Sequence, residues 1–148
     1  MQRSKTKQLA IRWVVYLAGM FVLAAGLTLN TKTGLGASAI VSVAHTISLC
    51  TGFTLGNITL VTYLLFIAAQ FVLKGKQRSG LDLLQLVVSV VFTRVLDLLK
   101  AAVPYQSGQN LVFDFLLLAL SIVLTGTGAA MVLSMDLIPN PADGIVNA

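Results

Sequence analysis

The sequence predicts an all-helical protein that crosses a membrane several times. Of its 148 residues, 57% are hydrophobic and only 10% are charged, whereas a soluble domain carries about 25% charged residues. A soluble core this small could not bury so much apolar surface. Four segments have the length of a membrane-spanning helix, roughly 17–25 residues. We therefore expect one membrane domain, residues 1–148, with four long spans and a short re-entrant or half-helix.

The first predicted span runs from Trp13 to Thr31 and follows a basic N-terminus. That N-terminus holds Arg3, Lys5, Lys7 and Arg12. A secretory signal peptide has the same order of a basic stretch and an apolar run, with cleavage near Ala24-Ala25 as the alternative. Because the chain goes on to span the membrane, we expect the first helix to be retained. Basic residues beside apolar runs mark the cytoplasmic side, so the N-terminus is expected there.

The segment from Thr33 to Gly52 is uncharged, and its apolar part is short. It is either a fifth span or a re-entrant half-helix. A second basic cluster follows the next span and consists of Lys74, Lys76 and Arg78. If the segment turns back, both basic clusters face the cytoplasm and only Lys32 stays outside. This arrangement agrees best with the positive-inside rule, so we predict a re-entrant segment.

Backbone that turns inside a membrane must be buried in protein or line a wet cavity. The predicted re-entrant segment therefore supplies the first candidate site residues, Gly36, Ser38 and His45. His45 could relay protons, because histidine titrates near neutrality. A hydrogen bond to a neighbouring helix is the simpler role. His45 is the only histidine, and no carboxylate accompanies it at ligand spacing, so we expect no metal site.

The second predicted span runs from Ile58, or already from Gly56, to Leu73 and begins after a polar turn. Thr54 or Asn57 could cap the free amides at its start. Those amides could equally bind an anion. Capping is the simpler expectation, and Asn57 is kept as a candidate site residue.

The third predicted span, Leu81 to Val103, carries a polar stripe. At about 100° per residue, one narrow arc holds Asp82, Gln85, Ser89, Thr93, Asp97 and Lys100, with Arg94 beside it. A charge at the bilayer centre costs roughly 2.5–3.5 kcal/mol, so this stripe should face other helices or water. In the functional interpretation, the residues from Asp82 to Asp97, with Arg94, line a route for a solute or ion. In the structural interpretation, Asp97 pairs with Arg94 or Lys100, and the outermost charges reach the interfaces.

The fourth predicted span, Leu111 to Met135, contains a cluster of small residues at positions 126–130. Such a cluster superficially suggests a phosphate-binding loop, but the strand before it and the lysine after it are missing. Close packing against another helix explains the cluster better.

The similarity of the segment Leu35–Ser42 to Asn140–Asn147 predicts an internal repeat, and chance similarity between apolar segments is the alternative. Three full crossings would separate a re-entrant first copy from the second, so the two units would be inverted, as in many transporters. The units would cover residues 13–103 and 111–148, the second one incomplete or short. Asn140 and Asp143 then stand at the start of a second half-helix, where Asp143 caps the helix or binds a cation.

Several motifs of this chain resemble one bacterial family. They are Gly34-Leu35-Gly36, the stretch from Thr51 to Val61, Asn140-Pro141-Ala142-Asp143-Gly144, and Asp97 late in the third span. From Trp13 to Ala148 the chain resembles the YczE/YyaS/YitT-type integral membrane proteins. The resemblance implies a duplicated multi-span protein whose biochemical activity is mostly unassigned. Where the family has a Pro and an Asp in the first motif, this chain has Ser38-Ala39.

The residues contain no nucleophile–base set and no nucleotide fingerprint, so we expect no enzyme and no cofactor. The basic clusters adjoin apolar runs, which favours a membrane anchor over a nucleic-acid surface. We expect a multi-pass protein of the bacterial inner membrane that moves or binds a small solute or ion. The alternative is a membrane scaffold or regulator that acts through partner helices. A homodimer could supply the helices that the second unit lacks.

Overall fold

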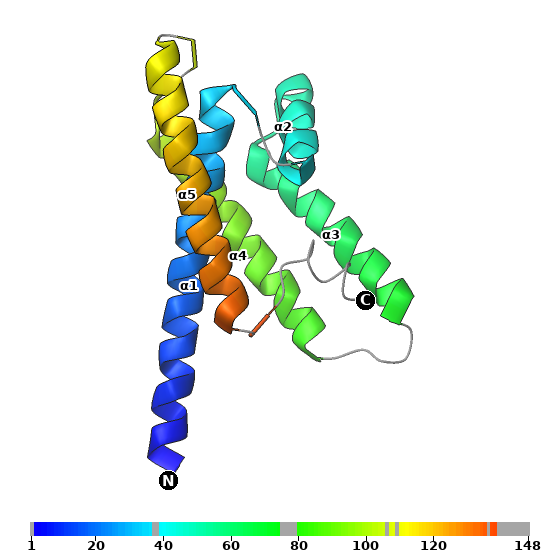
Figure 1. Ribbon diagram of the computed structural model, residues 1–148. Helices are drawn as coiled ribbons and strands as arrows, with labels where there is room; N and C mark the ends of the chain where they lie inside the picture. The colour runs from blue at the N-terminus through cyan, green and yellow to red at the C-terminus, as the bar shows by residue number, and fades with distance from the viewer. Residues whose placement is uncertain are drawn as a thin grey trace.

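The computed structural model describes residues 2–36, 39–74, 80–105, 107–108, 110–135 and 137–138. Side chains are described for residues 7–36, 41–73, 84–105, 107–108, 110–135 and 137–138. Every regular element in this part of the chain is an α-helix (Figure 1). The helices are α1 (Gln2–Thr33), α2 (Ala39–Thr51), α3 (Leu55–Lys74), α4 (Gly80–Ala102) and α5 (Leu111–Met135). The predicted all-helical class is confirmed for these residues.

Three of the described helices are long and apolar enough to cross a membrane: Lys7–Thr33, Leu55–Leu73 and Leu111–Met135. They contain the first, second and fourth predicted spans, which supports a membrane location. The third predicted span forms α4, whose 23 residues measure about 34 Å at 1.5 Å per residue. The part of α4 with described side chains carries three charged residues, Arg94, Asp97 and Lys100, and α4 is not among these three helices. That α4 crosses the bilayer therefore stays a prediction.

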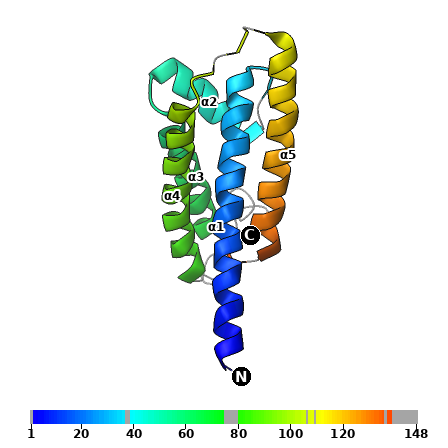
Figure 2. The same cartoon turned by 90° about the vertical axis from the view of Figure 1, so that its left-hand side faces the viewer.

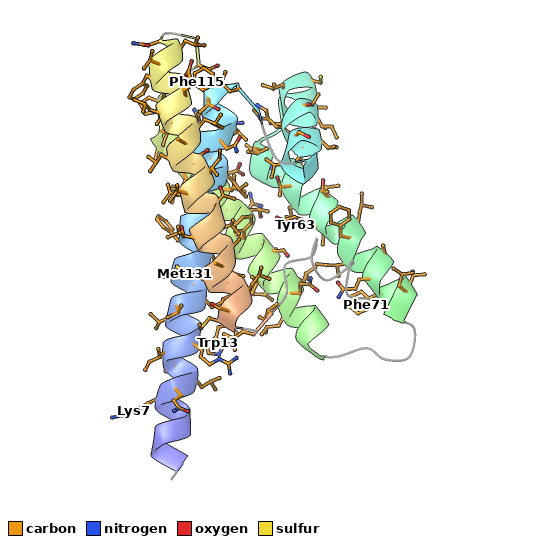
Figure 3. The ribbon with its side chains drawn as sticks, in the orientation of Figure 1. Lys7, Trp13, Tyr63, Phe71, Phe115 and Met131 are labelled. Carbon is orange, nitrogen blue, oxygen red and sulfur yellow. The ribbon has the colours of Figure 1, made fainter. Side chains whose placement is uncertain are left out.

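The helix α1 begins well before its predicted apolar run. Its first residues are basic and polar, and the helix there extends beyond the other helices (Figure 2). Lys7 lies on this extension, whereas Trp13 lies beside the end of α5 (Figure 3). The segment before Trp13 contains no glycine or proline, so nothing in it interrupts a helix. The apolar pattern of the sequence predicted the span that begins at Trp13. It did not predict that α1 begins before this residue.

The four long helices alternate in direction along the chain. At one end of the bundle α1 ends, α3 begins, α4 ends and α5 begins (Figures 1 and 2). We call this the distal end, and the opposite end, which holds the N-terminus, the proximal end. Because α1 ends and α3 begins at the same end, the intervening segment returns to where it started. The short helix α2 lies at the distal end against the first part of α3.

The helices α1 and α5 pack closely because glycines let their backbones approach. A β-carbon at Gly128 of α5 would lie 2.7 Å from Leu23 Cα, and one at Gly26 of α1 would lie 2.6 Å from the backbone nitrogen of Thr125. By contrast, nothing lies within 4 Å of a β-carbon at Gly126. The small residues of α5 therefore serve helix packing, as predicted, but only Gly128 of these two is at the contact.

Polar contacts fasten the proximal ends of α1 and α5. The Arg12 guanidinium donates a hydrogen bond to the carbonyl oxygen of Met135, in the last turn of α5. The Tyr16 hydroxyl donates to the carbonyl oxygen of Ile138 at 3.2 Å. A cation at a helix C-terminus also interacts favourably with the helix dipole. These contacts fix the register of the closest helix pair.

The predicted repeat cannot be followed in the structure. Ser38 of the first copy and all of Asn140–Asn147 in the second lie outside the described residues. The inverted repeat and its two units stay predictions.

Candidate functional site

Asp97 of α4 binds the start of α3. Its Oδ1 accepts a hydrogen bond from the Gly56 backbone N–H at 2.7 Å, and its Oδ2 accepts one from the Thr54 hydroxyl at 2.8 Å. The Thr54 oxygen in turn accepts the Asn57 backbone N–H at 3.2 Å. Two side chains thus satisfy free amides of the first turn, and a carboxylate there is favoured by the helix dipole. Thr54, one of the two caps that the sequence offered, caps α3.

Arg94 interacts with a different partner from the one that its spacing suggested. It lies one turn before Asp97 on α4, but its guanidinium donates to the Asn57 side-chain oxygen at 3.1 Å. The two neighbours on α4 therefore both contact the first turn of α3. Gly56 makes this approach possible, because a β-carbon there would lie 2.6 Å from the Asp97 carboxyl carbon.

The middle of the predicted polar stripe is buried. Gln85, Ser89 and Thr93 are each 1% exposed. The Ser89 hydroxyl donates to the Gln85 carbonyl at 2.7 Å, and the Thr93 hydroxyl donates to the Val90 carbonyl at 3.0 Å. The Gln85 amide has no hydrogen-bond partner among the described residues. The Asp82 side chain lies outside the described part, so the stripe is defined from Gln85 onward.

A cavity of about 570 Å³ opens at the distal end, just beyond this stripe. Its lining comes from α1, α2, α4 and the connections between helices. The lining residues are Thr31, Lys32, Gly34, Gly36, Ser42, His45, Thr46, Leu49, Lys100, Tyr105 and Ser107. Volumes of about 300–1,000 Å³ are typical of small-molecule sites. We call it the distal cavity.

The distal cavity is cationic. Lys32 comes from the last turn of α1 and Lys100 from the last turn of α4. Burial, followed by the positive charge of Lys32, disfavours the charged form of Lys100, and the charge of Lys100 also acts on His45 of α2. No acidic side chain is among the described residues that line the cavity. Three basic groups from three helices therefore face one space.

His45 adds an unsatisfied ring nitrogen. Its Nδ1 is buried and has no hydrogen-bond partner in the described part of the chain. The sequence suggested a hydrogen bond from His45 to a neighbouring helix, and the structure shows none to this nitrogen. Of the other candidates, Gly36 lines the cavity, whereas Asn57 lies at the start of α3. Asn140 and Asp143, like Ser38, lie outside the described residues.

One wall of the distal cavity is the connection between α4 and α5. Asp114, in the first turn of α5, is only 2% exposed. It accepts the Tyr105 hydroxyl at 2.6 Å and the Gly108 backbone N–H at 3.0 Å. The hydrogen bond to Asp114, followed by desolvation, raises the pKa of Tyr105 above its ordinary value. Asp114 thereby holds in place a segment whose Tyr105 and Ser107 line the cavity.

Of the three basic groups that face the distal cavity, the sequence indicates only His45 as a candidate site residue. It predicts Lys32 as an outside charge and Lys100 as an interfacial charge or a partner of Asp97. It indicates no role for Asp114, which holds one wall of the cavity. One signal was available: each lysine ends a helix, and the predicted topology places both helix ends on the same side. Among the described residues, no three His, Cys, Asp or Glu side chains gather as metal ligands.

Comparison with known proteins places the chain in a family. A family model described as a family of unknown function, DUF6198, matches residues 10–148. No curated protein and no solved structure matches the chain. The match covers all five helices except the first turns of α1. The chain therefore belongs to the family of unknown function DUF6198.

Proposed function

We propose that this protein is a multi-pass membrane protein that binds a small solute in the distal cavity and passes it into or across the membrane. The observation that carries the proposal is the cavity itself. It is large enough for a small organic molecule, and polar side chains from separate helices converge on it. One wall is α2, a short apolar helix of 13 residues. Such half-length elements line solute sites in transporters.

The proposed membrane orientation follows from the charges at the two ends. Arg12 lies at the proximal end, and α3 ends there at Lys74, with further basic residues following in the sequence. Cytoplasmic connections are rich in lysine and arginine. The proposal therefore puts the proximal end and the N-terminus in the cytoplasm, α4 across the bilayer as a fourth span, and the distal cavity on the other side. The resemblance to the YczE/YyaS/YitT-type proteins of the bacterial inner membrane agrees with this.

The alternative function, a scaffold or regulator that acts through partner helices, is favoured by one observation. Gln85, Ser89 and Thr93 of the polar stripe are buried, and the Ser89 and Thr93 hydroxyls donate to carbonyls of their own helix. A permanently closed stripe would give no route through the bundle. In a transporter, the stripe would have to become wet in a second conformation.

The test of the proposal is whether water reaches the distal cavity in a membrane. In a Cys50→Ser background, Thr46→Cys places a thiol in the cavity wall, and Leu65→Cys places one on an exposed apolar face of α3. A membrane-impermeant thiol reagent is added to intact cells. We expect the thiol at position 46 to react quickly and the thiol at position 65 to stay unmodified, because lipid covers it.

Two controls make the result decisive. Lys7→Cys should react only after the cells are permeabilised, which establishes sidedness. Both cavity and lipid-facing thiols should react fully after denaturation. If the thiol at position 46 reacts no faster than the one at position 65 in the folded protein, no wet cavity exists and the solute-binding function is wrong.

A further inference from the structure

We infer that the distal cavity is an anion site, and that its ligand is a small molecule or head group bearing a carboxylate or phosphate held by Lys32, Lys100 and His45. This inference rests on the proposed function, since it names the class of solute that the cavity would take. It is carried by the convergence of basic groups and by the absence of an acidic partner for them in the described lining.

The first step of the argument is the arrangement of the lysines. Lys32 and Lys100 lie 68 positions apart in the sequence, yet both line one cavity and their charges repel. Bringing two like charges together is unfavourable unless an opposite charge compensates them. The charge of Asp97 offsets part of this repulsion at Lys100, but its two oxygens accept hydrogen bonds from the start of α3, and Asp97 is not among the residues that line the cavity. An anion between the two ammonium groups would supply the missing charge.

The second step concerns His45. Its side chain lines the cavity beside the two lysines. A ring N–H of histidine can donate a hydrogen bond to a carboxylate or phosphate oxygen. The histidine lies in the same wall as Thr46, on the short helix α2. The ligand would therefore connect three helices that end or turn at the distal end.

The third step is size and donor type. About 570 Å³ exceeds what a single chloride ion needs and suits a small organic anion or a phosphate-bearing group. Lysine binds phosphate and carboxylate as a point charge, without the paired geometry that arginine imposes. The site should therefore accept both kinds of anion and discriminate mainly by charge and volume.

The experiment measures how anions stabilise the full chain in phosphatidylcholine nanodiscs. The thermal midpoint is followed as inorganic phosphate or succinate is added, with choline chloride at equal ionic strength as the screening control. We expect phosphate or succinate, but not choline chloride, to raise the midpoint. Lys32→Gln and Lys100→Gln should each raise the half-saturating anion concentration roughly tenfold or more, because each removes a charged hydrogen bond to the anion. Lys7→Gln, an exposed lysine on the α1 extension, should behave like the original protein.

A second pair of readouts separates binding from folding. Without added anion, Lys100→Gln should keep or raise the midpoint, because it removes repulsion from Lys32. Lys100→Arg keeps the charge and should restore the anion effect. If neither phosphate nor succinate stabilises the protein beyond the chloride control, or if Lys7→Gln loses the effect as fully as Lys100→Gln, the anion site is wrong.

The source of the anion is distinguished by adding phosphatidylglycerol to the nanodiscs. If the lipid raises the midpoint and abolishes the phosphate effect, the site holds a lipid head group. If phosphate and succinate act equally with and without it, the ligand is soluble. A reactive thiol at position 46 together with no anion effect would overturn this inference and leave the solute-binding function standing. An unreactive thiol would instead overturn the function itself.

Discussion

The Asp97 carboxylate of α4 receives the Gly56 backbone N–H of α3 at 2.7 Å, across 41 positions of sequence. A charged acceptor at the start of a helix is favoured both by the hydrogen bond and by the helix dipole. This relationship joins α4 to α3 at the distal end and leaves Asp97 little freedom to act elsewhere. It also turns the most conspicuous acid of the polar stripe into a structural residue of this conformation.

Replacing Asp97 by Ala should destabilise the protein measurably. The change leaves the Gly56 amide without its acceptor, which costs about 1–3 kcal/mol for a buried group. Asp97→Asn should cost less, since its side-chain oxygen can still accept one bond. In thermal unfolding in detergent, the original protein should be the most stable, Asp97→Asn intermediate and Asp97→Ala the least stable. An Asp97→Ala protein as stable as the original would contradict the capping role.

The same Asp97→Asn variant tests the polar route that the sequence suggested. If α4 carries a solute past Asp97, removing the charge should reduce uptake or binding of any solute that the protein handles. From the structure we expect the variant to retain solute binding in the distal cavity, because the carboxylate is engaged by α3. Phosphate stabilisation in nanodiscs, compared between the two proteins, measures this directly. If Asp97→Asn loses the stabilisation by phosphate while its own stability is unchanged, Asp97 takes part in solute binding.

Gly128 and Gly126 form a matched pair for the α1–α5 contact. Gly128→Ala should lower the unfolding free energy by roughly 1–3 kcal/mol, because the new methyl group would overlap the α1 backbone at Leu23. Gly126→Ala should be neutral or slightly stabilising, since nothing lies near its β-carbon and alanine favours a helix. Unfolding by a denaturing detergent, followed by circular dichroism, gives both values. Equal effects of the two substitutions would show that this helix contact is wrong.

The stability that the Tyr105–Asp114 hydrogen bond contributes should be lost at high pH. The folded protein holds the pKa of Tyr105 above its ordinary value of 10.0, chiefly through this bond. A group whose pKa is raised by folding contributes stability below its unfolded pKa, and that contribution is lost as pH rises through the folded pKa. The original protein should therefore lose more stability than Tyr105→Phe as the pH rises past about 10. If the thermal midpoints of the two proteins change by the same amount from pH 8 to 11, the proposed contribution of this hydrogen bond is wrong.

The return of residues 34–54 to the distal end predicts a specific topology. In the Cys50→Ser background, a thiol placed by Phe53→Cys should react with an impermeant reagent in intact cells, because Phe53 is exposed and precedes α3 at the distal end. A thiol placed by Gly75→Cys, just after α3 in the sequence, should react only after permeabilisation. The reverse pattern would mean that the segment from Thr33 to Gly52 crosses the membrane, and the proposed orientation would fail.

The sequence by itself located the long helices, and three of its four predicted spans lie in helices that are long and apolar enough to cross a membrane. The predicted fourth span and α5 have the same bounds, Leu111 to Met135, because an apolar run between a polar turn and a polar stretch is a local property. That Thr54 or Asn57 caps the start of α3 was predictable for the same reason, since a cap acts within three residues of itself, and the structure shows that Thr54 does so. The close packing of small residues on α5 was also predictable in kind, though not that Gly128 makes the contact and Gly126 does not.

Only the tertiary structure decided which groups meet. Helical spacing placed Asp97 beside Arg94 and Lys100, but the docking of α3 gave Asp97 and Arg94 partners about 40 positions away. The meeting of Lys32, His45 and Lys100 likewise depends on where α1 and α4 end and on how α2 folds back between them. A periodic pattern fixes the face of a helix that carries a side chain. The partner of that face is fixed by the backbone approach that glycines permit and by the lengths of the connections, which no local pattern contains.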